Sequence, residues 1–113
     1  MKDPASAFRA LAGTAIVLTT VGCASLAARA PMVTAGMSSA AAANGVDPAV
    51  LGRGRALYVG SCARCHVPVE VTSRTRQQWD EILPRMADKA GLEPVEEEEV
   101  AAYIDAVIDV AEP

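Results

Sequence analysis

Cys62, Cys65 and His66 lie in one five-residue segment, CARCH, which holds two of the chain's three cysteines and its only histidine. Cysteines three residues apart point to the same side of a tight helical turn, and the histidine directly follows the second one. The chain has 113 residues, which permits one domain at most. Its fold therefore has to present these three groups together.

The part of the chain expected to fold, about residues 46–111, is near the smallest size that buries an adequate core. Only 4% of the residues are aromatic, and many of the apolar residues are alanine. A domain of this size usually needs a covalent staple or a bound cofactor.

Three helices are predicted in this part, and no strand pairing is evident. The first begins at Asp47, which is followed by proline; the second is capped by Thr75 and ends at Gly91; the third opens at Pro94. Pro84 is expected to break or kink the second helix. The apolar faces are narrow and suit the enclosure of a flat apolar ligand. They comprise Val50, Gly54, Leu57, Tyr58 and Ser61; Trp79, Ile82, Leu83 and Met86; and Val100, Tyr103, Ile104, Val107 and Ile108.

The spacing of Cys62, Cys65 and His66 is typical of covalent haem attachment. Both sulfurs can form thioethers with the vinyl groups of one porphyrin, and His66 then lies beneath the iron as the first axial ligand. A structural zinc site needs four ligands, and only three are present. A redox dithiol normally sits in a βαβ setting, which is not predicted here. A disulfide between such close cysteines would restrain very little chain. We therefore predict one haem c.

The sequence around this motif resembles the small bacterial monohaem cytochromes c. The stretch GRALYVGSCARCH places Gly54 eight and Tyr58 four residues before Cys62, and VAAYIDAV carries Tyr103. The resemblance covers about residues 46–111. It implies an all-α, compact three-helix cytochrome c-like fold around one covalently bound haem. In that family, the glycine lets the first helix cross closely against the last, near an aromatic residue such as Tyr103.

Met86 is the predicted second axial ligand. His66 is the only histidine, so ligation by two histidines of one chain is impossible, and Met86 is the only methionine after the motif, twenty residues beyond His66. Longer family members place this methionine several tens of residues after the motif, but the segment QWDEILPRMADKAGL resembles compact variants with Trp and then Met on the middle helix. The alternatives are that Met86 only packs in the core or that Lys89 coordinates the iron.

The haem propionates would also need partners. Arg74, Arg76 and the indole N–H of Trp79 are the predicted ones; alternatively, the arginines are solvated and Trp79 only packs. His66 is expected to donate its second ring N–H to a carbonyl in the loop 67–69.

The N-terminal region reads as an export signal. Lys2 and Arg9 precede an uncharged run of 19 residues, Ala10–Ala28, and Gly22-Cys23 within it resembles the lipobox of bacterial lipoproteins. That resemblance implies a signal peptide at 1–22 and a diacylglycerol on the thiol of Cys23, the mature N-terminus. Alternatively, the run spans a bilayer uncleaved, or cleavage after Ala27 frees a soluble protein. All three interpretations place the domain outside the cytoplasm.

Residues 23–45 are then an alanine-rich, lipid-anchored tether, and residues 46–113 are the haem domain. The tether carries one charge and no bulky residues at helical spacing. As a flexible coil it would have an r.m.s. reach of about 25 Å. A partly helical alanine segment is the alternative.

The charge pattern bears on the partners. A formal net charge of −4 argues against general nucleic-acid binding. Five arginines and one acid lie between residues 53 and 76, whereas eleven acids lie between residues 80 and 112. Such a dipolar surface could orient a charged partner.

The predicted function is single-electron transport on the periplasmic side of the membrane by a monomeric carrier, not an enzyme. The partners would be redox proteins met transiently, such as a respiratory complex or a periplasmic dehydrogenase. Ligation by histidine and methionine raises the reduction potential relative to two histidines. The alternative is a five-coordinate haem protein that binds a gas or peroxide, as a sensor or weak peroxidase. A purely structural lipoprotein is a third possibility.

Overall fold

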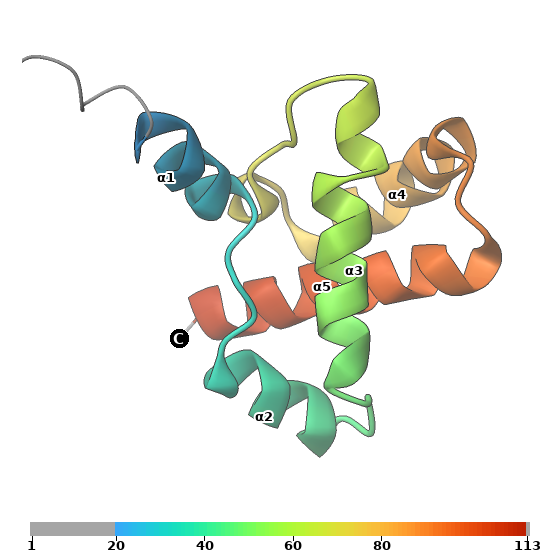
Figure 1. Cartoon of the computed structure of the whole chain (residues 1–113). Helices are drawn as coiled ribbons and strands as arrows, with labels where there is room; N and C mark the ends of the chain where they lie inside the picture. The colour runs from blue at the N-terminus through green and yellow to red at the C-terminus, as the bar shows by residue number, and fades with distance from the viewer. Residues whose placement is uncertain (1–19, 113) are drawn as a thin grey trace, which may run out of the picture.

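The computed structural model describes residues 20–112, which form helices and turns without a strand in that range (Figure 1). Residues 1–19, which hold most of the predicted signal peptide, and residue 113 lie outside this description, as does the side chain of Cys23. The all-α prediction is confirmed for the described part. Its elements are α1 (Thr20–Arg29), α2 (Ala35–Ala43), α3 (Ala49–Val59), the 3-10 turns η1 (Cys62–Arg64) and η2 (Val71–Ser73), α4 (Arg76–Ala90) and α5 (Pro94–Ala111).

The three predicted helices correspond to α3, α4 and α5, and their ends follow the expected cap chemistry. Thr75 accepts a hydrogen bond from the backbone N–H of Gln78, whose side chain in turn accepts from the N–H of Thr75, a complete capping box. Gly91 ends α4 in the left-handed conformation with φ 69°. Pro94 occupies the first turn of α5.

Pro84 does not break α4, which runs through it as one helix. The expected break is therefore wrong. Proline removes one backbone N–H and crowds the carbonyl four residues earlier. Both Pro84 and Asp80, the residue with that carbonyl, are exposed on the solvent side of α4, where water can satisfy the freed group.

The first and last helices of the predicted domain cross closely at Gly54. A Cβ atom built on Gly54 would lie 2.0 Å from the carbonyl oxygen of Glu99 and 2.9 Å from Cβ of Tyr103. In Figure 1, α3 runs across the middle of α5. Only glycine permits this approach, so the predicted crossing beside Tyr103 is confirmed.

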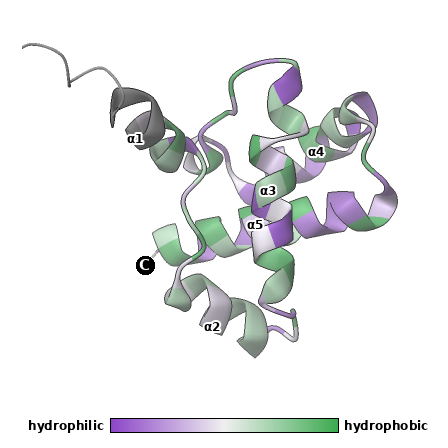
Figure 2. Cartoon of the chain, viewed as in Figure 1, coloured by the Kyte–Doolittle hydropathy of each residue, from purple (hydrophilic) through white to green (hydrophobic). Residues whose placement is uncertain are grey.

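The core lies where α3, α4 and α5 meet. The residues of α5 that face it begin at Val100, whereas the first turns of this helix are hydrophilic (Figure 2). Four acids, Glu96–Glu99, occupy these turns, where negative charge complements the helix dipole. The largest fully buried side chains of the core are Tyr58, Tyr103, Met37, Leu51, Ile104, Val71 and Val100, and Trp79 and Leu83 of α4 are almost fully buried beside them.

The expectation of a flexible tether before residue 46 is wrong for α2 and the residues just before it. Ala30, Met37 and Ala41 are buried in the same core, and α2 packs on α5. Thr34 caps α2 by accepting from the N–H of Met37 at 3.2 Å. Small alanine side chains allow α2 to approach α5, and the single large side chain, Met37, fills the space between them.

Two side chains of the predicted domain also fasten this segment. Arg55 donates from Nε to the carbonyls of Ala30, at 3.1 Å, and Pro31, at 3.0 Å. The hydroxyl of Tyr103 donates to the carbonyl of Pro31 at 2.8 Å. We call residues 30–46 the docked segment, because packing and hydrogen bonds hold it against α3 and α5. Within residues 20–112, no helix is both long and apolar enough to cross a membrane.

Candidate functional site

The CARCH motif lies on a tight turn directly after α3. Helix α3 ends at Gly60, and η1 then covers Cys62–Arg64, with Cys65 still in the right-handed helical region at φ −93° and ψ −35°. Cys62 is buried and Cys65 is exposed, and both are free thiols. The predicted helical turn is confirmed, and both sulfurs remain available for a covalent bond.

The thiol of Cys62 lies in a buried environment. Burial raises the pKa of Cys62, and the nearby guanidinium of Arg64 offsets this only in part. A raised pKa keeps this thiol in its less reactive, protonated form.

His66 is oriented by the residue that follows it. Its Nδ1 lies 2.8 Å from the carbonyl oxygen of Val67. A carbonyl can only accept, so Nδ1 carries the proton and donates it, and the lone pair is on Nε2 of this exposed side chain. The expected hydrogen bond to the loop 67–69 is confirmed, and the resulting tautomer is the one that binds a metal through Nε2.

The loop after His66 is held by side chains from three helices. Arg29 at the end of α1 donates to the carbonyl of Pro68 at 3.2 Å, and Tyr58 of α3 donates to the carbonyl of Val69. The next fixed carbonyl, that of Val71, accepts from Trp79 of α4 at 2.9 Å. No pattern in the sequence indicates this role of Arg29, and Tyr58 was predicted only as a residue of the apolar helix face. Together these bonds set the path of the loop that orients His66.

Arg64 ties the motif to the C-terminal end of α4. It donates from Nη2 to the carbonyl of Ala90 at 2.7 Å and from Nε to that of Ser61 at 3.3 Å. Met86 lies four residues before Ala90, hence one turn away on the same face of α4. It is half-buried and packs against the core. The structure thus brings η1 into contact with α4, with the bond of Arg64 at the C-terminal end of that helix, whereas Lys89 is exposed.

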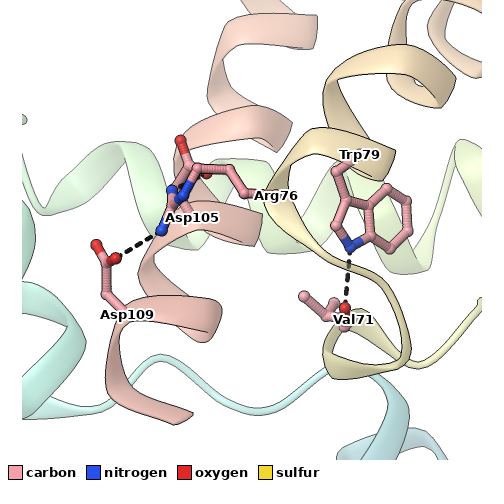
Figure 3. Close-up of polar contacts among 5 residues, drawn as sticks. All are labelled: Val71, Arg76, Trp79, Asp105 and Asp109. Atoms are coloured by element: carbon pink, nitrogen blue, oxygen red, sulfur yellow. Dashed lines mark hydrogen bonds and ion pairs between the residues drawn. The ribbon is translucent and has the colours of Figure 1, made fainter. Parts of the chain in front are cut away.

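Trp79 and Arg76 are engaged in contacts within the protein (Figure 3). The indole N–H of Trp79 is used by Val71, and its buried ring lies edge-on to that of Tyr58, with 6.0 Å between the centroids. Trp79 therefore packs in the core, which was the alternative to its predicted role as a hydrogen-bond partner of a propionate. In Figure 3, the side chain of Arg76 extends toward α5, away from the indole of Trp79.

Arg76 forms ion pairs with Asp105 and, at 2.6 Å, with Asp109, which are one turn apart on α5. Arg76 begins α4, and Ala90 at its other end is about 20 Å away along the helix axis. The structure therefore does not place Arg76 beside the CARCH turn. The position of Arg76 in the sequence does not predict these ion pairs, because the two acids lie about thirty residues later.

Arg74 remains near the loop. Burial raises the pKa of Tyr58, and the positive charges of Arg74 and Arg29 oppose this rise because both lie close to the phenol. Arg74 is half-buried just before α4. Of the two predicted arginines, it is the one that the structure keeps on the side of the motif.

Two hollows in the described part of the chain are lined by neither His66 nor Met86, although the first borders the motif at Ser61 and Arg64. One, of about 460 Å³, is lined by Arg53, Ala56, Leu57, Gly60, Ser61, Arg64, Glu96 and Glu99. The other, of about 440 Å³, is lined by residues of α2 and α5 together with Arg76. No group of three or more His, Cys, Asp and Glu residues between 20 and 112 is arranged to hold a metal ion. An axial pair of one histidine and one methionine is not a group of that kind.

Comparisons with protein-family models, with curated proteins and with solved structures found no match for this chain.

Proposed function

We propose that this protein is an extracytoplasmic electron carrier with one haem c bound covalently through Cys62 and Cys65. The residues present suit this group: two free thiols on one turn, and a histidine directly after them whose Nε2 has the lone pair. When bound, haem supplies a one-electron change between Fe(III) and Fe(II). The protein would hold it, exclude water and tune its potential.

His66 is the proposed first axial ligand. The observation that carries the proposal is its hydrogen bond to Val67, because it fixes the required tautomer on the CARCH turn itself. Donation to a carbonyl also makes the opposite nitrogen a stronger base. The side chains of Arg29, Tyr58 and Trp79 support this geometry by holding the following loop.

Met86 is the proposed second axial ligand. The supporting contact is that of Arg64 with the carbonyl of Ala90, which joins the motif to the C-terminal end of α4, one turn after Met86. A thioether favours Fe(II) and so raises the reduction potential. Arg74 is the better placed of the two arginines to meet a propionate. Trp79 would contribute by packing, and Arg76 by joining α4 to α5.

The chain would be attached to the outer face of a membrane through a diacylglycerol on Cys23. It would be monomeric and would meet its redox partners transiently. The proposal is for a carrier and not an enzyme.

Covalent attachment can be tested directly. The full chain is produced with a c-haem maturation system, and its denatured form is separated on a gel and stained for haem peroxidase activity. The wild type should stain, and the double variant Cys62→Ala, Cys65→Ala should not, because both thioethers are lost. Cys23→Ser is the matched control: it removes the third cysteine and should keep the stain.

Haem that extracts from the wild type into acidic organic solvent would contradict the proposal, since a thioether survives this treatment. A stained protein whose reduced form binds carbon monoxide at once would instead indicate a five-coordinate haem, and thereby the gas- or peroxide-binding alternative.

A further inference from the structure

The docked segment determines where the N-terminal anchor can be. Ala30 is fully buried, and the hydrogen bonds of Arg55 and Tyr103 fix the carbonyls of Ala30 and Pro31. The chain is therefore fastened to the domain from residue 30 onward. Only the residues between Cys23 and Ala30 separate the proposed lipid site from the body of the protein.

This short connection leaves the domain at the end that carries the CARCH loop. Arg29, the last residue of α1, donates to the carbonyl of Pro68, two residues after His66. In Figure 1, α1 and the loop between η1 and η2 lie at one end of the molecule, and α2 lies at the opposite end. From Cys23 to Arg29 the chain advances by six residues, which is about 9 Å as a helix or an r.m.s. length of about 13 Å as a coil. Both values are well below the reach of about 25 Å expected for a free tether.

The surface at this end suits a lipid headgroup region. Arg29 donates to the loop carbonyl of Pro68, and Arg74 directly follows η2 at the end of the same loop, so two arginines belong to the segments at this end. Next to His66, Val67 is 68% exposed, and Leu26 on α1 is 36% exposed. Arginines with exposed apolar side chains are attracted to the surface of an anionic bilayer.

We propose that the end of the molecule formed by Leu26–Arg29 and the loop 66–70 rests on the membrane surface. This inference relies on the proposed function, because it uses the lipid on Cys23. The site of electron exchange is then held toward the bilayer, and the partner is a redox protein embedded in the same membrane rather than one that diffuses in the periplasm. Residues 23–29, which the docked segment fastens to the domain, act as a short orienting arm.

The orientation can be measured with nitroxide labels on the full, lipidated holoprotein. Haem and lipid occupy all three native cysteines, so Val67→Cys or Val95→Cys supplies the only free thiol. Val95 is the matched control, because it is a valine of similar exposure, 60%, at the start of α5, across the molecule from α1 in Figure 1. The protein is inserted in vesicles of phosphatidylethanolamine and phosphatidylglycerol that contain a nickel-chelating lipid. The haem is kept reduced, because low-spin Fe(II) is diamagnetic.

The label at residue 67 should show several-fold stronger relaxation by surface nickel than the label at residue 95. A Gly/Ser insertion of about ten residues after Ser25 should remove this difference, because the anchor then reaches the domain through a free coil. Equal relaxation at both positions in the uninterrupted chain would overturn the inference, and so would stronger relaxation at residue 95.

Two controls separate this inference from the proposed function. Lipid labelling that persists in Cys23→Ser, or is absent from the wild type, refutes the anchor and the orientation together. A lipidated protein without haem stain refutes the electron carrier alone. The orientation can still be measured in that case, in a background with Cys62→Ser and Cys65→Ser. Equal relaxation in lipidated, haem-stained protein refutes the orientation alone.

Discussion

Substitution of Gly54 by alanine should strongly destabilise the crossing of α3 and α5. The new Cβ would lie 2.0 Å from the carbonyl oxygen of Glu99 and 2.6 Å from its carbonyl carbon, whereas real Cβ contacts essentially never fall below 3.0 Å. The obstructing atoms belong to a helix backbone, so no side-chain rotation relieves the clash. The two helices would have to separate by about 1 Å, which disturbs a close-packed interior.

The magnitude follows from two opposing terms. Overpacking of this kind costs about 1–3 kcal/mol and occasionally more, and contacts with rigid backbone belong at the upper end. Alanine gains about 1 kcal/mol over glycine inside a helix. The free energy of unfolding should therefore fall by about 2 kcal/mol or more, which lowers the melting temperature of a domain this small by about 8–16 °C.

Gly52 provides the matched control two residues earlier in α3. A Cβ on Gly52 would have no neighbour within 4 Å, so Gly52→Ala should raise the free energy of unfolding by about 0.5–1 kcal/mol. Urea unfolding of both variants, followed by circular dichroism at the helical minimum, measures the difference. If Gly54→Ala proved as stable as Gly52→Ala, the close crossing would not exist and this reasoning would be refuted.

Two further predictions concern the iron and the tyrosines. Met86→Ala should abolish the weak far-red band of oxidised His/Met haem, at about 700 nm, and should let the reduced protein bind carbon monoxide. If the wild type lacks this band, Met86 does not coordinate the iron and only packs in the core. Burial raises the pKa of Tyr103 to about 12. Because the folded state then holds this proton more tightly than the unfolded state, the stability it contributes is complete below the ordinary value of 10.0 and is lost as pH rises through 12. The urea concentration at half-unfolding should therefore decrease as pH is raised from 9 to 12, and it should decrease less in Tyr103→Phe. An equal decrease in that variant would contradict the raised pKa of Tyr103 as its cause.

Local chemistry made the helix ends and the close crossing predictable. Thr75, Gly91 and Pro94 act through hydrogen bonds or backbone conformations that involve only residues a few positions away. Gly54 was predictable because the resemblance to the cytochromes c pairs it with an aromatic on the last helix. The tautomer of His66 likewise depends on the adjacent residue.

The sequence was least informative where a residue's environment depends on distant elements. Arg76 was predicted either to meet a propionate or to be solvated, and in the structure α4 carries it toward Asp105 and Asp109 on α5. Trp79 was assigned a partner for its N–H before the path of η2, which supplies the carbonyl of Val71, could be known. An ion pair between residues about thirty positions apart, such as Arg76 and Asp105, produces no periodic pattern in the local sequence.

The docked segment shows how low complexity can conceal a structural role. An alanine-rich stretch has little apolar area of its own, so periodicity analysis assigned it to a tether. Its burial depends on the fit of small side chains against α5, an element more than fifty residues later in the chain. Met37 is the one large side chain that α2 buries, and it is the residue that could indicate from the sequence that this segment packs against the domain.

The same segment links the proposed anchor to the proposed iron site. Tyr103 contacts Gly54 at the crossing of α3 and α5 and also donates to Pro31, so the crossing and the docked segment share a residue. Arg29, just before that segment, fixes the carbonyl of Pro68 in the loop that orients His66. A change in the position of residues 29–31 would therefore act on the tyrosine at the crossing and on the histidine loop together. The residues around Arg29 thus belong to the structure that holds His66, so the proposed orientation on the membrane and the geometry of the CARCH turn are expected to be coupled.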